Sequence, residues 1–327
     1  MSRRLKHAVM VAGAVVLAVL TAVGVAPPVG GQNGPPGIVS LPTPTEAGPT
    51  STRAQAPSGT ERRAATTSTD SDAVTATPAL MPPSIIGAES VIGADGRTKV
   101  QPPATSTFPL SAIGQIEFFR SGSPVMWICT GYLIDANSVL TAGHCSYDGG
   151  TGEAGVIESA DFFPGRNRSN GVVQNPFGSC AMTAVWAPDR WVDDGRAAHD
   201  YSVQQLDCTI GNSTGWFGLF ALEGTNAFAG RRLRVEGYPG DRNFGSRWKM
   251  AGLVQRSSIN TLHYPMDTYG GQSGSPLFKW NRPSCGGPCS AGVHAYGAGG
   301  NPPTNSGPRL TKGRIGVITA VAAENGG

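Results

Sequence analysis

The sequence predicts an all-β protein built from closed antiparallel barrels. Charged residues make up only 14% of the 327 residues, whereas glycine (46) and proline (26) are abundant. This composition favours many short strands and turns over long helices. From residue 90 onward, short apolar runs alternate with turn residues, and strands of this length and spacing are typical of barrels. The chain is long enough for one large core or two small ones.

Residues 1–26 are predicted to be a signal peptide. Arg3, Arg4 and Lys6 give a positive start, and residues 8–25 are almost wholly small or apolar. An uncleaved membrane anchor is the alternative, because this run is about long enough to span a bilayer. No later stretch is apolar enough to do so. We therefore expect a secreted, extracellular protein without membrane contact once the signal is removed.

Residues 27–89 are predicted to form a largely disordered pro-segment. They are rich in Pro, Ser, Thr, Ala and Gly and contain no aromatic residue. With so little to bury, the segment cannot offset the entropy of ordering itself. Every aromatic residue and every cysteine lies after Glu89. The folded unit is therefore expected over 90–327, with the first barrel at about 90–215 and the second at about 216–327.

In the first half of the folded unit, apolar runs at 113–119 and 125–133 flank the turn residues 120–124, a hairpin pattern. Residues 138–141 form the next predicted strand and lead directly to His144. Residues 201–206 alternate in polarity and follow Asp200. Shorter strands are expected near 172–173 and 184–186.

In the second half, strands are expected at 233–237, 250–254, 276–279 and 291–294. Residues 311–323 form the single plausible terminal helix, although their β-branched residues weaken helix propensity. Net charge is +3 and no long basic run occurs, so a nucleic-acid partner is not expected.

Residues 266–276 carry a candidate nucleophile. They read Met-Asp-Thr-Tyr-Gly-Gly-Gln-Ser-Gly-Ser-Pro and place Ser273 among glycines. Glycines let the backbone turn sharply and let a substrate carbonyl approach bare N–H groups. A serine hydroxyl is a weak nucleophile, so it needs a base and an orienting acid. The chain supplies His144 in Thr-Ala-Gly-His-Cys and Asp200 in His-Asp-Tyr-Ser.

Together these motifs resemble the chymotrypsin-fold serine peptidases, which share their chain order of His, Asp and Ser. Finer motifs resemble the secreted bacterial glutamyl endopeptidases, and they lie at 90–93, 237–241, 266–276 and 285–289. The resemblance covers nearly the whole folded unit. It implies two antiparallel β-barrels of the chymotrypsin type with a short C-terminal helix.

The resemblance implies a role for each candidate residue. Ser273 is the nucleophile, His144 is the general base and acid, and Asp200 orients the imidazole. The backbone N–H groups of Gly271 and Ser273 form the oxyanion hole. The alternatives to Asp200 are nearby acids, namely Asp193, Asp194 and Asp207.

The resemblance also implies a pocket for an acidic side chain. Thr268 and His294 are placed to donate charge-assisted hydrogen bonds to a carboxylate. The α-amino group of Ser90 is expected near this pocket in the mature enzyme. The expected reaction is cleavage on the carboxyl side of Glu, and less well Asp, through an acyl-enzyme. A structural core histidine is the alternative for His294.

Asp267 supports a competing specificity. It lies six residues before Ser273, where trypsin-like enzymes keep the acid that selects Arg or Lys. A serine endopeptidase of basic or broad specificity is therefore the first alternative. One argument against this alternative is that the motif of the glutamate-selective enzymes also contains this Asp. A second is that the composition boundary after Glu89 would suit self-cleavage between Glu89 and Ser90, although another protease could make that cut. An inactive binding module on the same fold is the alternative from another class.

Gln272 departs from the pattern of the animal digestive enzymes. Those enzymes place an Asp there to pair with the new N-terminal amine, and glutamine cannot form that ion pair. The mature N-terminus is therefore expected to act at the pocket instead.

Six cysteines in an exported chain favour disulfides. The resemblance implies a bridge between Cys129 and Cys145. Cys285 and Cys289 enclose a loop tight enough to close on itself, with a zinc site as the alternative. The remaining pair is Cys180 and Cys208. No cofactor and no metal are expected, with a structural calcium ion as the alternative. The expected partners are protein and peptide substrates of a monomeric enzyme.

Overall fold

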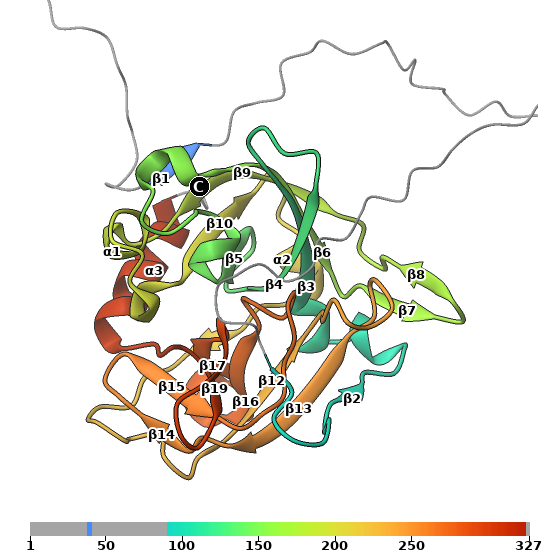
Figure 1. Ribbon diagram of the computed structural model, residues 1–327. Helices are drawn as coiled ribbons and strands as arrows, with labels where there is room; N and C mark the ends of the chain where they lie inside the picture. Colours follow the sequence, from blue (N-terminus) through green and yellow to red (C-terminus); the bar gives the residue numbers. More distant parts are fainter. Residues whose placement is uncertain (1–37, 41–89, 325–327) are drawn as a thin grey trace, which may run out of the picture. The chain divides into compact units, whose positions relative to one another are not determined.

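The computed structural model describes residues 38–40 and 90–324, and these form two β-barrels with a few short helices (Figure 1). The expected signal peptide lies outside the described residues, and so does most of the expected pro-segment. Across the described ranges, no helix has the length and apolar character needed to cross a membrane. The predicted fold class is confirmed.

The first barrel is a closed ring of six strands. These are β3 (Ile113–Arg120), β4 (Met126–Leu133), β5 (Ser138–Thr141), β6 (Ile157–Pro164), β9 (Cys180–Trp186) and β10 (Ser202–Leu206). The order β9-β10-β5-β4-β3-β6 closes where Phe162 of β6 pairs with Cys180 of β9. Strand β6 is not predicted from the sequence, because Glu158 and Asp161 interrupt its apolar positions. Both point to solvent on the outer face of the ring.

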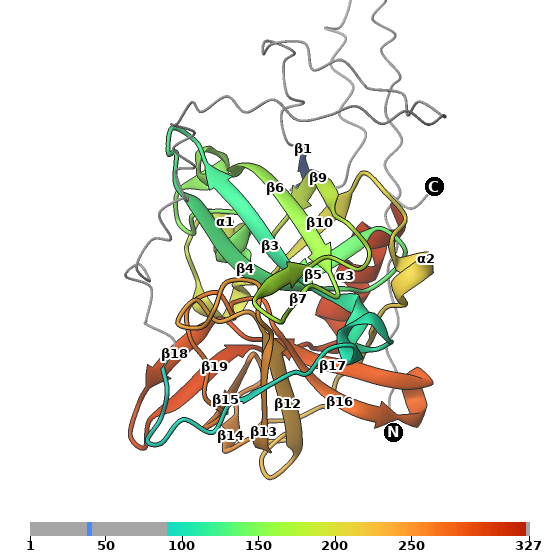
Figure 2. The same ribbon diagram turned by 90° about the vertical axis from the view of Figure 1, so that its right-hand side faces the viewer.

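The second barrel is divided into two hydrogen-bonded sheets. One contains β2 (Thr98–Lys99), β11 (Gly218–Leu219), β12 (Arg232–Gly237), β13 (Trp248–Leu253), β16 (Pro276–Arg282) and β17 (Gly287–Val293). The other contains β14 (Arg256–Ser257), β15 (Thr261–Tyr264), β18 (Tyr296–Gly299) and β19 (Thr304–Pro308). A β-bridge between Gly292 and Arg309 joins the two sheets. Figure 2 shows these strands grouped below those of the first barrel.

Short elements connect the strands. They are β7 (Asn167–Ser169), β8 (Val172–Gln174), α1 (Asp189–Val192), α2 (Gly211–Thr214), and the 3₁₀ turns η1 (Ala104–Ser106), η2 (Leu110–Ala112), η3 (Gly143–Cys145), η4 (Gly152–Gly155), η5 (Ala197–His199) and η6 (Pro283–Cys285). Two of them, η3 and η5, place the candidate catalytic residues.

Arg247 ties the two barrels together from the inside. It is fully buried, and its Nη1 donates to the carbonyl oxygens of Leu110 (2.7 Å) and Ile113 (2.9 Å) at the start of the first barrel. Its Nε lies 3.1 Å from a carboxylate oxygen of the equally buried Glu236. Burial raises the pKa of Glu236, and the Arg247 charge opposes that rise. Removing Glu236 would take away the carboxylate that pairs with the buried Arg247, whereas removing Arg247 would leave Glu236 with the more distant Arg234 at 3.7 Å.

Helix α3 (Lys312–Glu324) lies within one residue of the predicted terminal helix. It follows the second barrel in sequence but packs on the first, where Ile318 and Val321 join the core (Figure 1). The Gln205 side chain donates to the Val321 carbonyl at 3.4 Å. Because α3 covers its outer face, β10 is buried at every position instead of alternating as its sequence predicts.

Strand β1 (Ile38–Ser40) pairs antiparallel with β9, and Val39 faces Val185 in the register. Figure 1 shows it as a short blue arrow beside β9. Residues 27–89 are predicted to be largely disordered, and no strand is predicted there. On this edge of β9, strand β6 pairs only with residues 180–181. From residue 184 onward β6 leaves the edge unoccupied, and β1 pairs with it there. Open edges accept extended β-branched segments such as Ile-Val.

Candidate active site

The Ser273 turn depends on two glycines in the left-handed region. Gly271 has φ +98° and Gly274 has φ +89°. A Cβ added at Gly274 would lie 1.9 Å from the Thr130 carbonyl oxygen, and one at Gly271 would lie 2.5 Å from the Tyr238 carbonyl oxygen. Neither position can accept another residue without moving the backbone. The glycines therefore let the turn pack closely against Thr130 of the first barrel and Tyr238 of the second.

His144 and Asp200 meet through two contacts. The His144 Nδ1 lies 2.8 Å from Asp200 Oδ2, and the His144 backbone N–H donates to Asp200 Oδ1 at 2.8 Å. Asp200 is fully buried, directly after η5, and His144 lies in η3. The carboxylate thus holds both the ring and the loop that carries it. The alternative acids lie elsewhere: Asp193, Asp194 and Asp207 are exposed.

Ser273 comes from the second barrel but is held against the first. Its carbonyl oxygen accepts a hydrogen bond from the Thr130 N–H at 2.8 Å. The Cys145 sulfur, next to His144, lies 3.9 Å from the same oxygen. On the other side of the turn, the Gly274 N–H donates to the His294 carbonyl at 2.7 Å. Ser273 therefore lies between the loop of His144 and the segment that follows β17, where His294 lies.

Three side chains around His144 are missed by the sequence analysis. Trp191 and Tyr296 flank the imidazole, each with its ring centroid 6.4 Å away. Arg120 donates to the His144 carbonyl at 2.9 Å and forms an ion pair with Asp148. No local pattern marks these residues. Their nearness to His144 arises from chain segments far apart in sequence.

Thr268 and His294 are both fully buried. The Thr268 N–H donates to the Ser90 carbonyl at 3.4 Å, while its Oγ1 has no hydrogen-bond partner in the part of the chain that the structure describes. The His294 Nδ1 lies 2.6 Å from the Tyr264 hydroxyl. Tyr264 is also missed by the sequence analysis. It lies on β15, whose four residues are too short to show a clear period.

Asp267 binds the N-terminal segment. Its Oδ1 accepts from the Ile92 N–H at 2.8 Å and its Oδ2 accepts from the Gly96 N–H at 2.7 Å. The residue is 1% exposed. Both carboxylate oxygens are therefore occupied by backbone donors, which argues against Asp267 as a selector of basic side chains.

Asn305 fixes the start of the same segment and has no signal in the sequence. Its side-chain amide donates to the carbonyl oxygens of Ser90 and Met266, each at 2.8 Å. Its Oδ1 lies 3.4 Å from the Ser90 backbone nitrogen. The Ser90 backbone is therefore held both by the Asn305 side chain and by the Thr268 N–H.

The cysteines form three disulfides, Cys129–Cys145, Cys180–Cys208 and Cys285–Cys289. Two groups have metal-binding spacing, Cys129–His144–Cys145 and Cys180–Asp207–Cys208. Their sulfurs are already bonded to each other, so they offer no thiolate for zinc. The same holds for Cys285 and Cys289.

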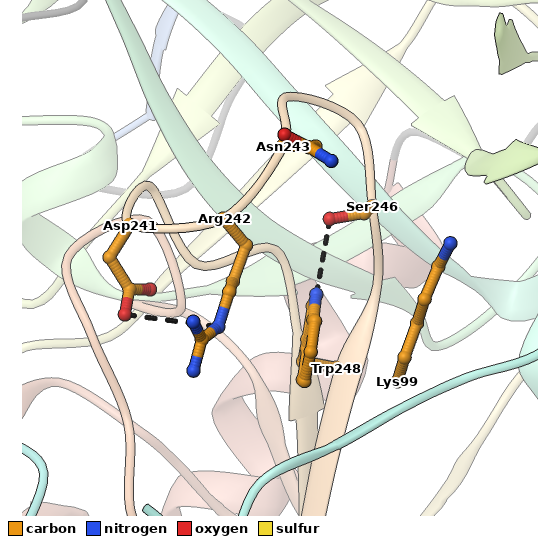
Figure 3. Close-up of a pocket in the computed structure, with 6 residues that line it drawn as sticks. All are labelled: Lys99, Asp241, Arg242, Asn243, Ser246 and Trp248. Carbon is orange, nitrogen blue, oxygen red and sulfur yellow. Dashed lines mark hydrogen bonds and ion pairs between the residues drawn. The ribbon is translucent and has the colours of Figure 1, made fainter. Parts of the chain in front are cut away.

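A surface pocket of about 300 Å³ lies beside the loop that follows β12. It is lined by Lys99, Asp241, Arg242, Asn243, Ser246 and Trp248. Figure 3 shows the Trp248 indole N–H directed at the Ser246 hydroxyl, a 3.1 Å hydrogen bond. His144, Asp200 and Ser273 are not among its lining residues, so this pocket is separate from the candidate catalytic site.

Comparison with known proteins defines the class. The family described as "Trypsin-like peptidase domain" matches residues 129–282. With its two β-barrels, the chain is a serine endopeptidase, a hydrolase of peptide bonds. It is 39% identical over 237 residues to the glutamyl endopeptidase of Bacillus licheniformis, covering 72% of this chain and 69% of that one. The chain belongs to the glutamyl endopeptidase family.

Two further likenesses were found, and the first agrees with this assignment. The solved structure of a Glu endopeptidase in complex with MPD has a TM-score of 0.59 and 32% identity, covering 71% of this chain and 99% of that chain. A Bacillus subtilis protein named extracellular metalloprotease is 33% identical over 190 residues, covering 58% of each chain.

Proposed function

We propose that this protein is a secreted endopeptidase that cleaves on the carboxyl side of Glu, and less well Asp, through an acyl-enzyme on Ser273. Proteins and peptides are its substrates, and it acts as a monomer. The observation that carries the proposal is the fully buried Thr268 hydroxyl without a partner in the described residues, close to Ser90. A buried hydroxyl of this kind can bind a ligand that supplies the hydrogen-bond partner.

The catalytic step follows from the His144–Asp200 contact. With the Nδ1 proton held by Asp200 at 2.8 Å, Nε2 is free of a proton and can accept the one from the Ser273 hydroxyl. The Ser273 oxygen then bonds to the substrate carbonyl carbon. His144 returns the proton to the leaving amine as the peptide bond breaks. In the second half of the reaction, water gives a proton to His144 Nε2 and its oxygen bonds to the acyl carbon. The Ser273–acyl bond then breaks, and His144 returns the proton to the Ser273 oxygen, which releases the new carboxylic acid.

The peptide orientations of the turn support an oxyanion hole at Gly271 and Ser273. The Gly270 carbonyl accepts from the Gly240 N–H at 2.6 Å, and the Gln272 carbonyl accepts from the Ser275 N–H at 2.9 Å. In a trans peptide the C=O and the N–H point to opposite sides. The N–H groups of Gly271 and Ser273 are therefore turned away from these contacts. Two such donors can stabilise the negative charge on the tetrahedral intermediate.

Glutamate preference follows from the donors around Thr268. When the Tyr264 phenol donates to His294 Nδ1, the imidazole proton lies on Nε2, which makes that nitrogen a donor. Together with the Thr268 hydroxyl, it can bind a carboxylate by charge-assisted hydrogen bonds. A neutral side chain of the same length would leave these buried donors poorly paired.

The new N-terminus adds a positive charge at the same place. Ser90 is held beside Thr268 by Asn305 through contacts of its backbone, so cleavage after Glu89 would create an ammonium group there. Extending the mature N-terminus by one alanine is expected to weaken the preference for Glu. Unchanged kinetics in that variant would contradict this role for Ser90.

The test of the proposed function is a pair of peptides that differ only in Glu or Gln before the scissile bond. We expect wild type to prefer Glu by about 100-fold or more in kcat/KM, and Thr268→Val to lose at least about tenfold of that ratio. Thr319→Val, on the exposed face of α3, is the matched control and should keep the ratio. Preferred cleavage after Arg or Lys would support the alternative specificity.

Labelling with a fluorophosphonate tests the nucleophile directly. Wild type should be labelled and Ser273→Ala should not, whereas an inactive binding module would leave both unlabelled. The intact masses of secreted wild type and secreted Ser273→Ala then show whether the enzyme itself or another protease cleaves after Glu89. If wild type alone begins at Ser90, maturation is autocatalytic.

A further inference from the structure

The turn that carries Ser273 keeps its shape only if each of its peptide groups is held in one orientation. Gly270 and Gly271 lack a Cβ, so the peptides next to them rotate more easily than those of other residues. Backbone N–H groups hold the Gly270 and Gln272 carbonyls, at 2.6 Å and 2.9 Å. The Gly271 carbonyl lies between these two, in the peptide group that links the two proposed oxyanion donors. Its own contact therefore matters for the aim of both donors.

Thr130 of β4 supplies the donor for the Gly271 carbonyl. Its hydroxyl donates to that oxygen at 2.9 Å and accepts the Tyr238 N–H at 3.0 Å. A hydroxyl has a single proton, so acceptance from Tyr238 leaves that proton for Gly271. Thr130 is fully buried, and solvent does not reach the residue to compete for the contact. The side chain of a first-barrel strand thus orients a peptide of the second barrel.

The backbone of Thr130 is held by both barrels. Its N–H donates to the Ser273 carbonyl at 2.8 Å. This N–H is available for the turn because β5 pairs with β4 further along, at Tyr132 and Leu133. The Thr130 carbonyl accepts the Thr141 hydroxyl at 2.7 Å. The Thr130 hydroxyl therefore projects from a strand position that is itself fixed by hydrogen bonds.

Glycines make room for Thr130 on the side of the second barrel. A Cβ added at Gly237, the last residue of β12, would lie 2.6 Å from Thr130 Oγ1. One added at Gly274 would lie 1.9 Å from the Thr130 carbonyl oxygen. Both distances are shorter than a nonbonded contact allows, so side chains at these positions would push Thr130 and the turn apart. The contact with Gly271 thus depends on the direct approach of the two barrels.

We propose that Thr130 is a positioning residue, whose hydroxyl fixes the Gly271–Gln272 peptide and so aims the N–H groups of Gly271 and Ser273 at the oxyanion. Thr130 contacts carbonyl oxygens of the turn and acts through them on the reaction. This role rests on the proposed function, because these two N–H groups are the donors proposed above for the tetrahedral intermediate.

Loss of the hydroxyl leaves the Gly271 carbonyl without this donor. The peptide can then rotate about the bonds of Gly271 toward another donor, and the N–H groups on either side move with it. The oxyanion forms only after Ser273 attacks, so poorer aim weakens binding of the transition state and leaves substrate binding nearly unchanged. Neither contact of the Thr130 hydroxyl involves Thr268, so the preference for Glu over Gln should stay.

The test is Thr130→Val, which keeps the branched shape and the backbone contacts and removes the hydroxyl. We expect kcat on a Glu peptide to fall about tenfold and KM to stay within about twofold of wild type. Thr130→Ala, which places no methyl group against the Gly271 carbonyl, should show the same split. Thr130→Ser keeps the hydroxyl and should restore most of the turnover. Unchanged kcat in both hydroxyl-free variants, or an equal loss in Thr130→Ser, overturns the proposal.

Thr214→Val is the matched control. Thr214 is buried at the end of α2, and its hydroxyl lies 3.3 Å from the Ile210 carbonyl and 3.1 Å from the Gly215 carbonyl. Its loss should lower the melting temperature and keep kcat within about twofold of wild type. Equal losses of kcat in the Thr214 and Thr130 variants would mean that Thr130 has only a structural role.

A pair of inhibitors tests the oxyanion site without turnover. With a peptidyl trifluoromethyl ketone that carries a Glu side chain, the Ser273 oxygen bonds to the ketone carbon. The serine proton passes to His144, and the carbonyl electron pair becomes the oxyanion. The corresponding trifluoromethyl alcohol cannot form this bond. Thr130→Val should weaken inhibition by the ketone about tenfold and by the alcohol less than about twofold. Equal weakening of both inhibitors overturns the role of Thr130 in aiming the oxyanion donors.

Failure of this proposal and failure of the proposed function give different results. Wild type that fluorophosphonate does not label would overturn the proposed function. Labelled wild type that prefers another side chain before the scissile bond would overturn the Glu pocket, and the Thr130 comparison is then made on that preferred peptide. Labelled wild type, with unchanged kcat and unchanged ketone inhibition in Thr130→Val, overturns the role of Thr130 alone.

Discussion

Two buried aspartates, Asp200 and Asp267, show how the partner decides what a carboxylate does. Asp200 is fully buried and contacts the ring of His144, a group that can take up and release a proton. Asp267 is almost as deeply buried but binds the backbone N–H groups of Ile92 and Gly96, which do not titrate. The first carboxylate can influence a reaction, whereas the second holds a chain segment in place.

The two regions are also anchored differently. The loop of His144 is tied to β4 by the Cys129–Cys145 disulfide. The segment that begins at Ser90 is held by hydrogen bonds and by Arg97, which pairs with Asp95 and Asp241. We therefore expect changes at the catalytic region to affect rate most and changes at the N-terminal segment to affect stability and specificity.

The largest expected effect is on turnover. In Asp200→Asn, an amide replaces the acceptor that holds the Nδ1 proton of His144, so kcat on a Glu peptide should fall about 10⁴-fold. Asp267→Asn should keep kcat within about tenfold of wild type, because it touches no reacting group. Steady-state kinetics of both variants measure the difference. Equal losses would show that the two carboxylates do not have separate roles.

The second largest expected effect is on stability, and it concerns the disulfide that anchors the His144 loop. Replacing Cys129 and Cys145 by alanine opens a loop with a sequence separation of 16, which should lower the free energy of unfolding by about 3 kcal/mol. The matched control replaces Cys285 and Cys289, whose separation is only 4. Urea denaturation should show a smaller loss for the control. The reverse order would contradict the loop-closure explanation.

The third effect concerns the hydrogen-bonded anchor. Asp267→Asn leaves one oxygen to serve the N–H groups of Ile92 and Gly96, so one of these partly buried hydrogen bonds loses its acceptor. The free energy of unfolding should fall by about 2 kcal/mol. Hydrogen exchange at the Ile92 or the Gly96 amide should become faster. An unchanged exchange rate there would mean that another acceptor replaces the carboxylate.

The smallest effect is on the pH dependence of stability. The hydrogen bond from Arg97 lowers the pKa of Asp95 from its ordinary 3.8 to about 2. A depressed carboxylate pKa stabilises the fold above the unfolded value, and this stabilisation is lost as pH falls from about 4 to about 2. The melting temperature should therefore fall less steeply between pH 5 and pH 2 in Asp95→Asn than in wild type. Because Asp95 is partly exposed, the difference is small, and identical slopes would exclude a contribution.

Short-range patterns in the sequence sufficed for the barrel class and the main strands. The runs that become β3, β4, β5 and β16 and the terminal helix α3 are visible because their apolar positions and turn residues lie within a few residues of each other. The Gly271 and Gly274 turn is visible for the same reason, since only glycine suits its backbone. The motifs around His144 and Ser273 likewise lie within single short stretches.

Tertiary structure alone decided which distant groups meet. Ser90 and Asn305 are 215 residues apart, and Ile92 and Asp267 are 175 apart. Which way a loop side chain points depends on barrel closure, because no local period sets its direction. Tyr264, Tyr296 and Asn305 therefore carry no signal in the sequence, and Asp267 carries an ambiguous one. Its carboxylate faces the N-terminal segment because the closed barrel brings two unpaired backbone donors to it.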